Sequence, residues 1–309
     1  MNVVPIAFAF DNNLVLPACV CISSLMMNAK ADTFYDIYIL HSAKHGIDKS
    51  GLDRIPGYYN NCKIHYREIG NDFEGAFEIR GITTPAYYRL LIPEVIPEYD
   101  KIIYSDVDVI FRDDLSYLFE KTDLSNCYVA GVNSLSYLEP ELIKYYNEIG
   151  IDSGGIIYSG NLIINSKLMR EDRIVDYFRG MADKRFRYQD MDILNLVCQD
   201  RIKYLPPSFC ATDHFFLYAY HNQNSLEPLW DRQEIEYALL YGVIHYNGCK
   251  PWKSYCVNFD IWWEYYRKSP FYDEVFYFDF FYSRIDEYDR LSFTKRLKIL
   301  LRYFVYGKK

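Results

Sequence analysis

The first 200 residues alternate between short apolar runs and longer segments of helical length. Residues 3–10 form a continuous apolar run, which is typical of a strand buried on both faces, and residues 34–40 and 63–68 predict two more strands. Helices are expected at residues 14–28 and 49–55. Strands that alternate with helices favour right-handed crossovers, so we expect an α/β fold with a mainly parallel central sheet flanked by helices.

The same alternation continues to about residue 255. A helix is expected at 84–92, where Pro93 and Pro97 stop it, and an apolar segment follows at 101–111. Further strands are expected at 128–132, 156–165 and 243–246, and further helices at 166–182 and 190–199. Residues 255–288 are aromatic and acidic and predict a helical appendage, and a basic tail closes the chain. We therefore predict a main domain over residues 1–255 and an appendage over 256–309.

Two acidic residues interrupt the apolar segment 101–111, KIIYSDVDVIF. Burying Asp106 and Asp108 so close together costs several kcal/mol unless a cation lies between them. At the end of a strand both carboxylates can reach one hard cation, which suits Mg²⁺ or Mn²⁺. The alternative is a solvated or helix-capping pair.

A second candidate segment, HYNGCKPW, begins at His245. Gly248 allows close approach of a ligand to the backbone, and Lys250 is a point charge suited to phosphate. An imidazole can complete a Mn²⁺ shell, so His245 gains a role if it lies near Asp106 and Asp108. On its own, a histidine at a strand end is more often structural.

Two helix starts also carry candidate side chains. Asp11 and Asn13 follow the first strand, at the edge where open α/β sheets bind ligands, although an Asx turn that caps the next helix explains them equally well. The segment 188–195, YQDMDILN, opens a helix with Asp190 and Asp192 in its first turn, where the helix dipole favours acids. Its additional amide side chains also indicate the polar wall of a site.

Charge and cysteine content narrow the class of protein. The 34 basic and 42 acidic residues give a net charge of −8, which argues against duplex nucleic acid as the main partner. The eight cysteines show no CxxC pair, so we expect reduced thiols in a cytoplasmic protein. No apolar run is long enough to span a bilayer, and the N-terminus lacks the features of a signal peptide.

The C-terminal tail differs in charge from the rest of the chain. Residues 290–309 hold seven basic and no acidic residues, and these alternate with apolar residues at near-helical spacing. Such a segment is typical of an amphipathic helix at an anionic membrane surface, so we expect a peripheral protein on the inner face of the membrane. A solvated basic terminus that packs on the acidic body is the alternative.

Six segments resemble, in order, the motifs of the family 8 glycosyltransferases, which include bacterial lipopolysaccharide galactosyl- and glucosyltransferases and glycogenin. They read AFAFDNN, TTPAYYRLL, DKIIYSDVDVIF, SGNLIIN, YQDMDILN and HYNGCKPW. Six motifs in one order are far more specific than any single motif, and the chain is identified as a member of this family. The resemblance implies a GT-A type α/β domain over about residues 1–255.

The resemblance also implies a site for a UDP-sugar. Its metal ligands for Mn²⁺ (or Mg²⁺) would be Asp106, Asp108 and His245, and Asp190 would be the catalytic acid that faces the transferred sugar. Asp11 and Asn13 match contacts to uridine, Arg89 approaches the sugar and phosphate, and Gly248 and Lys250 match contacts to the diphosphate. The implied donor-binding residues are Ala9, Asp11, Asn13, Arg89, Asp106, Val107, Gly160, Gly248 and Lys250.

Three departures from the family pattern lie around the sugar and the base. Leu14 stands where an aromatic residue often stacks on uracil, and Met191 replaces a glutamine that is often proposed to steady the sugar cation. Tyr158 replaces an asparagine that contacts a sugar hydroxyl, and Asn161 is the candidate substitute. The resemblance therefore carries over the diphosphate site and leaves the identity of the sugar open.

The function implied by the resemblance is retaining, metal-assisted transfer of glucose or galactose from UDP-glucose or UDP-galactose to a cell-surface glycan or lipid-linked acceptor. A non-catalytic UDP-sugar-binding protein is the main alternative. A DxD phosphatase is a third reading, which is disfavoured because Ile110 stands where that motif has Thr or Val and because the motif lies 100 residues into the chain.

Overall fold

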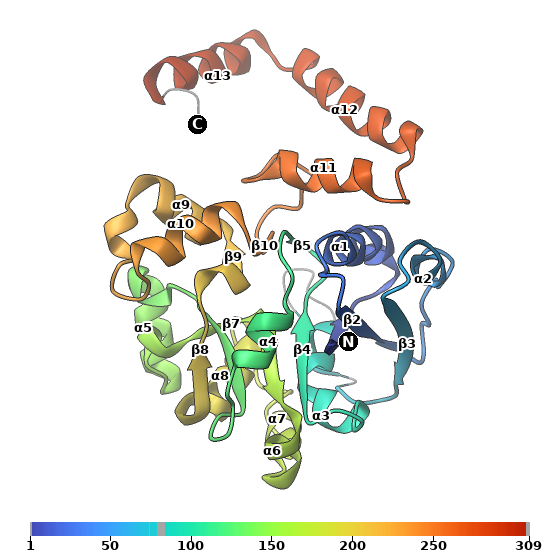
Figure 1. The fold of residues 1–309 in the computed structure, drawn as a ribbon. Coiled ribbons are helices and arrows are strands. Elements are labelled where there is room, and N and C mark those ends of the chain that lie inside the picture. Colours follow the sequence, from blue (N-terminus) through green and yellow to red (C-terminus); the bar gives the residue numbers. More distant parts are fainter. Residues whose placement is uncertain (1, 74, 79–83, 307–309) are drawn as a thin grey trace. The chain divides into compact units, whose positions relative to one another are not determined.

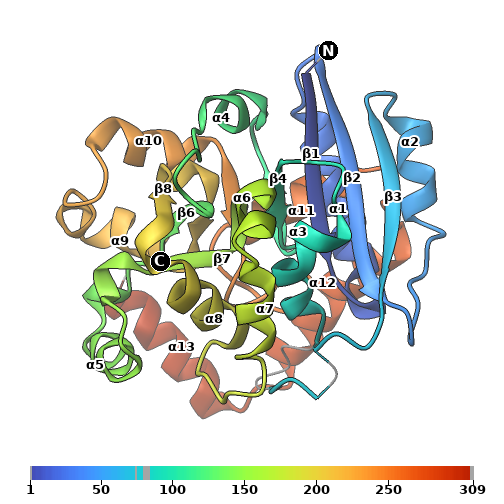
Figure 2. The same cartoon turned by 90° about the horizontal axis from the view of Figure 1, so that it is seen from below.

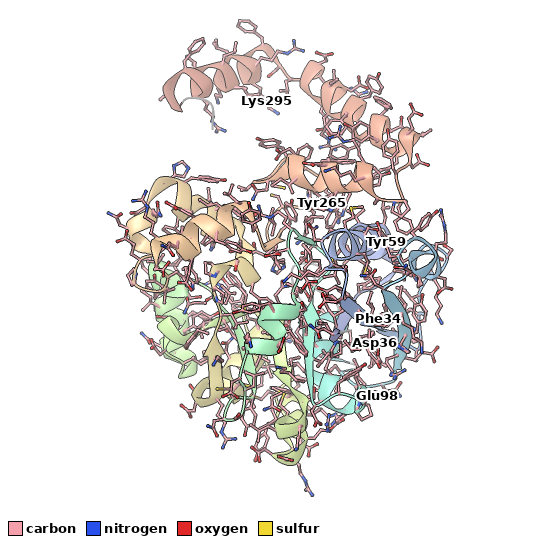
Figure 3. The ribbon with its side chains drawn as sticks, in the orientation of Figure 1. Phe34, Asp36, Tyr59, Glu98, Tyr265 and Lys295 are labelled. Carbon is pink, nitrogen blue, oxygen red and sulfur yellow. The ribbon has the colours of Figure 1, made fainter. Side chains whose placement is uncertain are left out.

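The computed structural model describes residues 2–73, 75–78 and 84–306. The chain divides into two compact units, Met1–Pro270 and Phe271–Lys309 (Figure 1). The first unit therefore extends beyond residue 255 and includes helix α11 (Phe259–Lys268). Asn28 donates to the hydroxyl of Tyr265 in α11 at 3.0 Å, which attaches that helix to the end of helix α1 (Val15–Met27) (Figure 3).

The described residues form two sheets. The strands are β1 (Asn2–Ala9), β2 (Thr33–Ser42), β3 (Cys62–Ile69), β4 (Lys101–Ser105), β5 (Val109–Phe111), β6 (Val129–Asn133), β7 (Ile157–Asn165), β8 (Ile202–Tyr204), β9 (Ala211–Thr212) and β10 (Val243–His245). The larger sheet has the order β3-β2-β1-β4-β7-β6-β8, and the smaller has the order β5-β10-β9 (Figures 1 and 2).

The central sheet is mixed, with a parallel majority. Strands β3, β2, β1 and β4 pair in parallel, as the alternation with helices predicts, and so do β6 and β8. Strand β7 pairs antiparallel with both β4 and β6. Because β1 to β4 are parallel, their carboxyl ends lie at one edge of the sheet, which is where ligands bind in open α/β sheets.

Helices flank the sheet (Figure 2). The remaining α-helices are α2 (Ile55–Tyr58), α3 (Ile92–Val95), α4 (Ser116–Lys121), α5 (Pro140–Ile149), α6 (Ser166–Glu171), α7 (Ile174–Arg179), α8 (Gln189–Cys198), α9 (Asp213–His221), α10 (Arg232–Leu240), α12 (Glu274–Asp289) and α13 (Phe293–Tyr306). One core cluster joins β1, β2, β4 and β7 to α3, α6, α7 and α8. Alternate residues of β1, such as Ala7 and Ala9, enter this cluster, as the two-residue period of a strand requires.

Three local expectations need correction. Residues 101–111 do not form one strand, because β4 ends at Ser105 and β5 begins at Val109 in the other sheet. Residues 84–91 form the 3-10 helix η3 (Thr84–Leu91) instead of an α-helix. The expected helix 166–182 is split into α6 and α7, since Arg173 between them has a φ of 53°, which an α-helix cannot contain.

A polar cluster fixes the outer strands of the sheet. The buried carboxylate of Asp36 in β2 lies 2.8 Å from Nε2 of His65 in β3, and it accepts hydrogen bonds from the hydroxyls of Tyr38 and Tyr99 (Figure 3). A buried carboxylate is stable only when it is paired in this way. The cluster satisfies its own polar groups and is structural.

The second unit consists of α12 and α13. The exposed apolar residues of α13 are Phe293, Leu297, Ile299, Leu300, Leu301, Phe304 and Val305, and most of them recur at spacings of three and four. The expected basic tail includes residues 308 and 309, which lie outside the described residues. None of the described helices combines the length and hydrophobicity that crossing a bilayer requires.

Candidate active site

A pocket of about 480 Å³ opens at the carboxyl edge of β1, β2 and β3. Residues from the ends of all three strands line it, including Asp11, Asn13, Ser42 and Gly70. It lies at the edge where the topology predicts ligand binding. Leu14 is not among its lining residues.

Both interpretations of Asp11 are compatible with its position. Its carboxylate accepts from the backbone N–H of Asn13 at 2.9 Å and caps a 3-10 turn, Asn12–Leu14. The backbone N–H of Asp48 also donates to Asn12 at 2.7 Å, so the turn after β1 is joined to the loop after β2. Asp11 and Asn13 therefore lie at the pocket, in a turn that is fixed by its own cap and by the hydrogen bond from Asp48.

Asp106, Asp108 and His245 converge where the end of β4 in the larger sheet meets β5 and β10 of the smaller sheet. Asp106 follows β4 of the larger sheet, whereas Asp108 precedes β5 and His245 ends β10 in the smaller one. The antiparallel pairing of β5 with β10 places Val109 opposite His245. One ligand atom from each of the three residues lies within 4.8 Å of the others, so this group can hold a metal ion.

Glycine at position 160 leaves the space that this group needs. A Cβ at Gly160 in β7 would lie 2.2 Å from Cε1 of His245 and 2.8 Å from Oδ2 of Asp106. The backbone N–H of Asp106 also donates to the carbonyl of Gly160 at 2.7 Å. The glycine leaves a space that any larger residue would fill, and two carboxylates and an imidazole surround it. This ligand set fits a divalent cation of the Mn²⁺ type.

Positive charge already compensates the carboxylates. Burial alone would raise the pKa of Asp108, but Lys250 and His245 hold it well below its usual range. Burial alone would lower the pKa of His245, but Asp108 raises it to about 10. Lys250 donates to Asp108 and to the carbonyl of Tyr246. A metal ion would therefore displace a proton from His245, so metal affinity should increase with pH.

A second charge network adjoins the metal group. Arg89 is buried, and its guanidinium lies 2.9 Å from Oδ1 of Asp106 and 3.2 Å from Oδ2 of Asp190. Ser159 donates to the same Oδ2 of Asp190 at 3.0 Å. Burial raises the pKa of Asp190 to about 6, an effect that Arg89 opposes and Asp106 reinforces. The structure thus brings Asp190 and Arg89 together with the metal group.

We expect Gly160→Ala to destabilise the protein by about 1–3 kcal/mol, the usual cost of overpacking, and to weaken metal binding. The added methyl group would collide with His245 and Asp106. Thermal unfolding with and without Mn²⁺ checks both effects. Gly57→Ala is the matched control, because nothing lies within 4 Å of a Cβ there. Equal unfolding temperatures for the two variants would contradict the steric argument.

The family-model match decides the classification. The model described as Glycosyl transferase family 8 matches residues 5–256. The chain belongs to glycosyl transferase family 8. A putative glycosyltransferase of Haemophilus influenzae is 26% identical over 69% of this chain and 63% of its own length. The lipopolysaccharide 1,2-glucosyltransferase of Escherichia coli is 22% identical over 81% of this chain and 73% of its own length.

A solved structure agrees with the family. The galactosyltransferase LgtC, in complex with donor and acceptor sugar analogues, is 26% identical and covers 87% of this chain and 98% of its own, with a TM-score of 0.69. The fold is accordingly of the GT-A type, which confirms the fold expected from the motifs. Family membership favours a transferase over a DxD phosphatase.

Several of the expected polar side chains turn out not to face the site. In α8, Asp192 accepts from Tyr145 and from the backbone of Tyr188, while Gln189 and Asn195 bond to backbone carbonyls. Only Asp190 of this segment contacts Arg89. Asp192 is therefore a structural residue of the helix start.

The departures around the sugar also have structural outcomes. Asn161 is fully buried and its amide donates to Ser105 at 3.1 Å, while its Oδ1 has no hydrogen-bond partner among the described residues, so its contact with a sugar stays a prediction. The hydroxyl of Tyr158 accepts from Thr212 at 3.1 Å. Met191 is half-buried against a small core cluster around Tyr146.

Sequence reasoning missed three residues next to the site. Tyr104 donates to Asp106 at 2.7 Å and lies under the Arg89 guanidinium, 4.5 Å from ring centroid to Cζ. Its spacing of two from Asp106 along a strand was the available signal. Ser159 lies in the motif YSG, but the sequence does not indicate that its side chain contacts Arg89 and Asp190. Cys210, whose Sγ lies 3.5 Å from Nδ1 of His245, belongs to no motif.

Proposed function

We propose that this chain is a retaining hexosyltransferase that moves glucose or galactose from a UDP-sugar to a hydroxyl of a glycan acceptor. The observation that carries the proposal is the convergence of Asp106, Asp108 and His245 beside the Arg89 and Asp190 pair. Relatives named for glucosyl and galactosyl transfer support the hexose. The acceptor that we propose is a cell-surface polysaccharide or a lipid-linked oligosaccharide.

The proposed metal ligands are Asp106, Asp108 and His245, and the proposed ion is Mn²⁺ or Mg²⁺. Such an ion would stabilise the negative charge that develops on the departing diphosphate. Lys250 keeps its proton because Asp108 raises its pKa against the effect of burial. It can therefore add a fixed positive charge at the same place.

The nucleotide would occupy the pocket at the ends of β1, β2 and β3. Asp11 and Asn13 line that pocket and can bind the uridine. Ala9, Val107 and Gly248 are further proposed contacts to the donor. Ala9 and Val107 are buried, so their contribution would come from backbone atoms. Leu14 offers no aromatic ring for stacking, so polar contacts would carry base recognition.

Asp190 is the proposed catalytic residue. Arg89 and Ser159 orient its carboxylate, which would stabilise positive charge on the anomeric carbon. A covalent sugar intermediate would require Asp190 as nucleophile, because Met191 cannot serve. We favour attack by the acceptor on the same face that UDP leaves, with the departing phosphate oxygen accepting the acceptor's proton. Binding both substrates in one pocket supplies the proximity that this route needs.

UDP release from a panel of UDP-hexoses in the presence of Mn²⁺ tests the proposal. Turnover of a single donor, UDP-glucose or UDP-galactose, is expected. If no donor is turned over but UDP binds in a metal-dependent manner, the chain is a non-catalytic UDP-sugar binder or lacks its acceptor. Absence of UDP binding would contradict the donor site itself.

We also propose that α13 contacts an anionic membrane surface, which would bring the site to a lipid-linked acceptor. Lys295, Lys298 and Arg302 follow one flank of the helix at spacings of three and four, beside its exposed apolar residues. The side chain of Lys295 is exposed (Figure 3). Basic side chains beside an apolar face are the features that bind a helix to anionic lipids.

The membrane contact predicts a specific loss of affinity. Lys295→Gln with Lys298→Gln should weaken binding to vesicles with anionic lipid roughly 30-fold, because each basic residue contributes about 1 kcal/mol. Co-sedimentation of the full chain at low salt measures this. Lys144→Gln with Lys203→Gln is the control, since both lysines lie in the first unit. Wild-type protein that fails to co-sediment would refute the contact.

A further inference from the structure

The proposed metal ligand His245 has a second ring nitrogen with its own partner. Nε2 lies 3.3 Å from Oδ1 of Asp108 and 3.6 Å from Oδ2 of Asp106, so Nε2 is the atom that faces a cation. Across the described part of the chain, the side-chain atom in hydrogen-bonding reach of Nδ1 is Sγ of Cys210, at 3.5 Å. Cys210 is 1% exposed and His245 is 4% exposed.

The backbone fixes Cys210 at this place. Its N–H donates to the carbonyl of Pro207 at 3.1 Å, which ends the 3-10 helix η7 (Pro207–Phe209). The next two residues form β9, which pairs in parallel with β10 so that Thr212 is opposite His245. Cys210 therefore reaches Nδ1 from the position just before β9, independently of the loop that carries Asp106 and Asp108.

We propose that Cys210 is a positioning residue for the metal site, and this proposal rests on the proposed function. A histidine that binds a metal through Nε2 must carry its proton on Nδ1, and the acceptor of that proton fixes both the tautomer and the ring orientation. The usual acceptor is a carboxylate, a carbonyl or water. Here the acceptor is the Sγ atom of a buried cysteine, so the ring is oriented without a third carboxylate beside a group that already has two.

Cys210→Val removes the acceptor and replaces it with an apolar side chain that is one heavy atom larger, a change that the Cys198→Val control shares. We expect the Kd for Mn²⁺ to increase about tenfold, the lower end of the usual effect of removing such a partner. Mn²⁺ is titrated into the full chain without any donor, and free Mn²⁺ is followed by electron paramagnetic resonance. Cys210→Ser, which keeps an acceptor, should recover part of the affinity.

Cys198→Val is the matched control. Cys198 is also a buried thiol, and burial alone raises its pKa, but it belongs to the core of α8 and has no contact with a metal ligand. Its Kd for Mn²⁺ should equal that of the wild type. A loss of affinity in both valine variants would indicate general destabilisation and would overturn the proposal.

A spectroscopic readout separates positioning from packing. With ¹⁵N-labelled histidine and diamagnetic Mg²⁺, Nδ1 of His245 should carry the proton in the wild type and a mixture of tautomers should appear in Cys210→Val. An unchanged Kd and an unchanged tautomer in Cys210→Val would overturn the proposal. If the valine variant does not fold, the same two measurements are made on Cys210→Ala. Wild-type protein that binds no Mn²⁺ contradicts the proposed metal site itself, which distinguishes the two failures.

Discussion

Asp108→Ala is expected to lower the rate of UDP release from the preferred UDP-hexose by about 10³-fold. The substitution removes a metal ligand, and charge stabilisation by a bound metal contributes several kcal/mol to the transition state, each 1.36 kcal/mol being a factor of ten. It also removes the partner of Lys250 and of His245. Steady-state kinetics at saturating donor with varied Mn²⁺ give the measurement.

The control must retain the fold and the local charge. Asp113→Ala removes a carboxylate just beyond β5 that bonds to Tyr237 outside the metal group, so its rate should stay within a few-fold of the wild type. Asp108→Asn preserves the shape of the side chain and should still lose metal binding in calorimetry. Activity of Asp108→Asn at the wild-type level would refute the metal assignment.

Asp190→Asn is expected to lower kcat by about 10²–10³-fold, the usual effect of removing one group that stabilises charge in a transition state. The amide is neutral and cannot balance positive charge on the sugar. Asp192→Asn is the matched control, because Asp192 is buried in the same helix turn but bonds to Tyr145 and not to Arg89. An unchanged kcat for Asp190→Asn would remove the catalytic assignment.

The pH dependence gives an independent check on Asp190. Because burial raises its pKa to about 6, the active carboxylate is lost as pH falls through 6, so wild-type kcat should decrease there. For stability the sign is opposite: a raised pKa favours the folded state below the ordinary carboxyl range, and this contribution is lost as pH rises through 6. Above pH 6, Asp190→Asn should therefore unfold at a temperature no lower than that of the wild type.

The fold was predictable where pattern and topology agree. The apolar run of β1 and the helix-strand alternation up to β4 led to the parallel strands, because a doubly buried strand leaves a clear signature. The break between β4 and β5 was not predictable, since the apolar residues on both sides of Asp106 and Asp108 continue the same period. The antiparallel position of β7 depends on tertiary pairing, which the period of a strand does not encode.

Site residues that belong to sequence motifs could be predicted, whereas residues outside the motifs could not. Asp106, Asp108 and His245 come together as expected, although 137 positions separate Asp108 from His245 in the chain. The sugar contact of Asn161 stays a prediction, because its buried side chain keeps an oxygen without a hydrogen-bond partner among the described residues. Nothing in the sequence indicated a role for Cys210, because a cysteine outside regular structure is typical of a protein core. The register of β9 against β10 brings it to His245.

Because the proposed metal group lies at the junction of the two sheets, metal binding there would also affect how the sheets are held together. Since Asp106 follows β4 of the larger sheet, whereas Asp108 precedes β5 and His245 ends β10 in the smaller one, a cation bound at the proposed site would connect the two sheets. Occupancy is then thermodynamically linked to the docking of β5, β9 and β10, so the amides of these strands should exchange more slowly with solvent when metal is bound. Substitutions that loosen this docking will be recognised as losses of metal affinity, even when they lie far from any ligand.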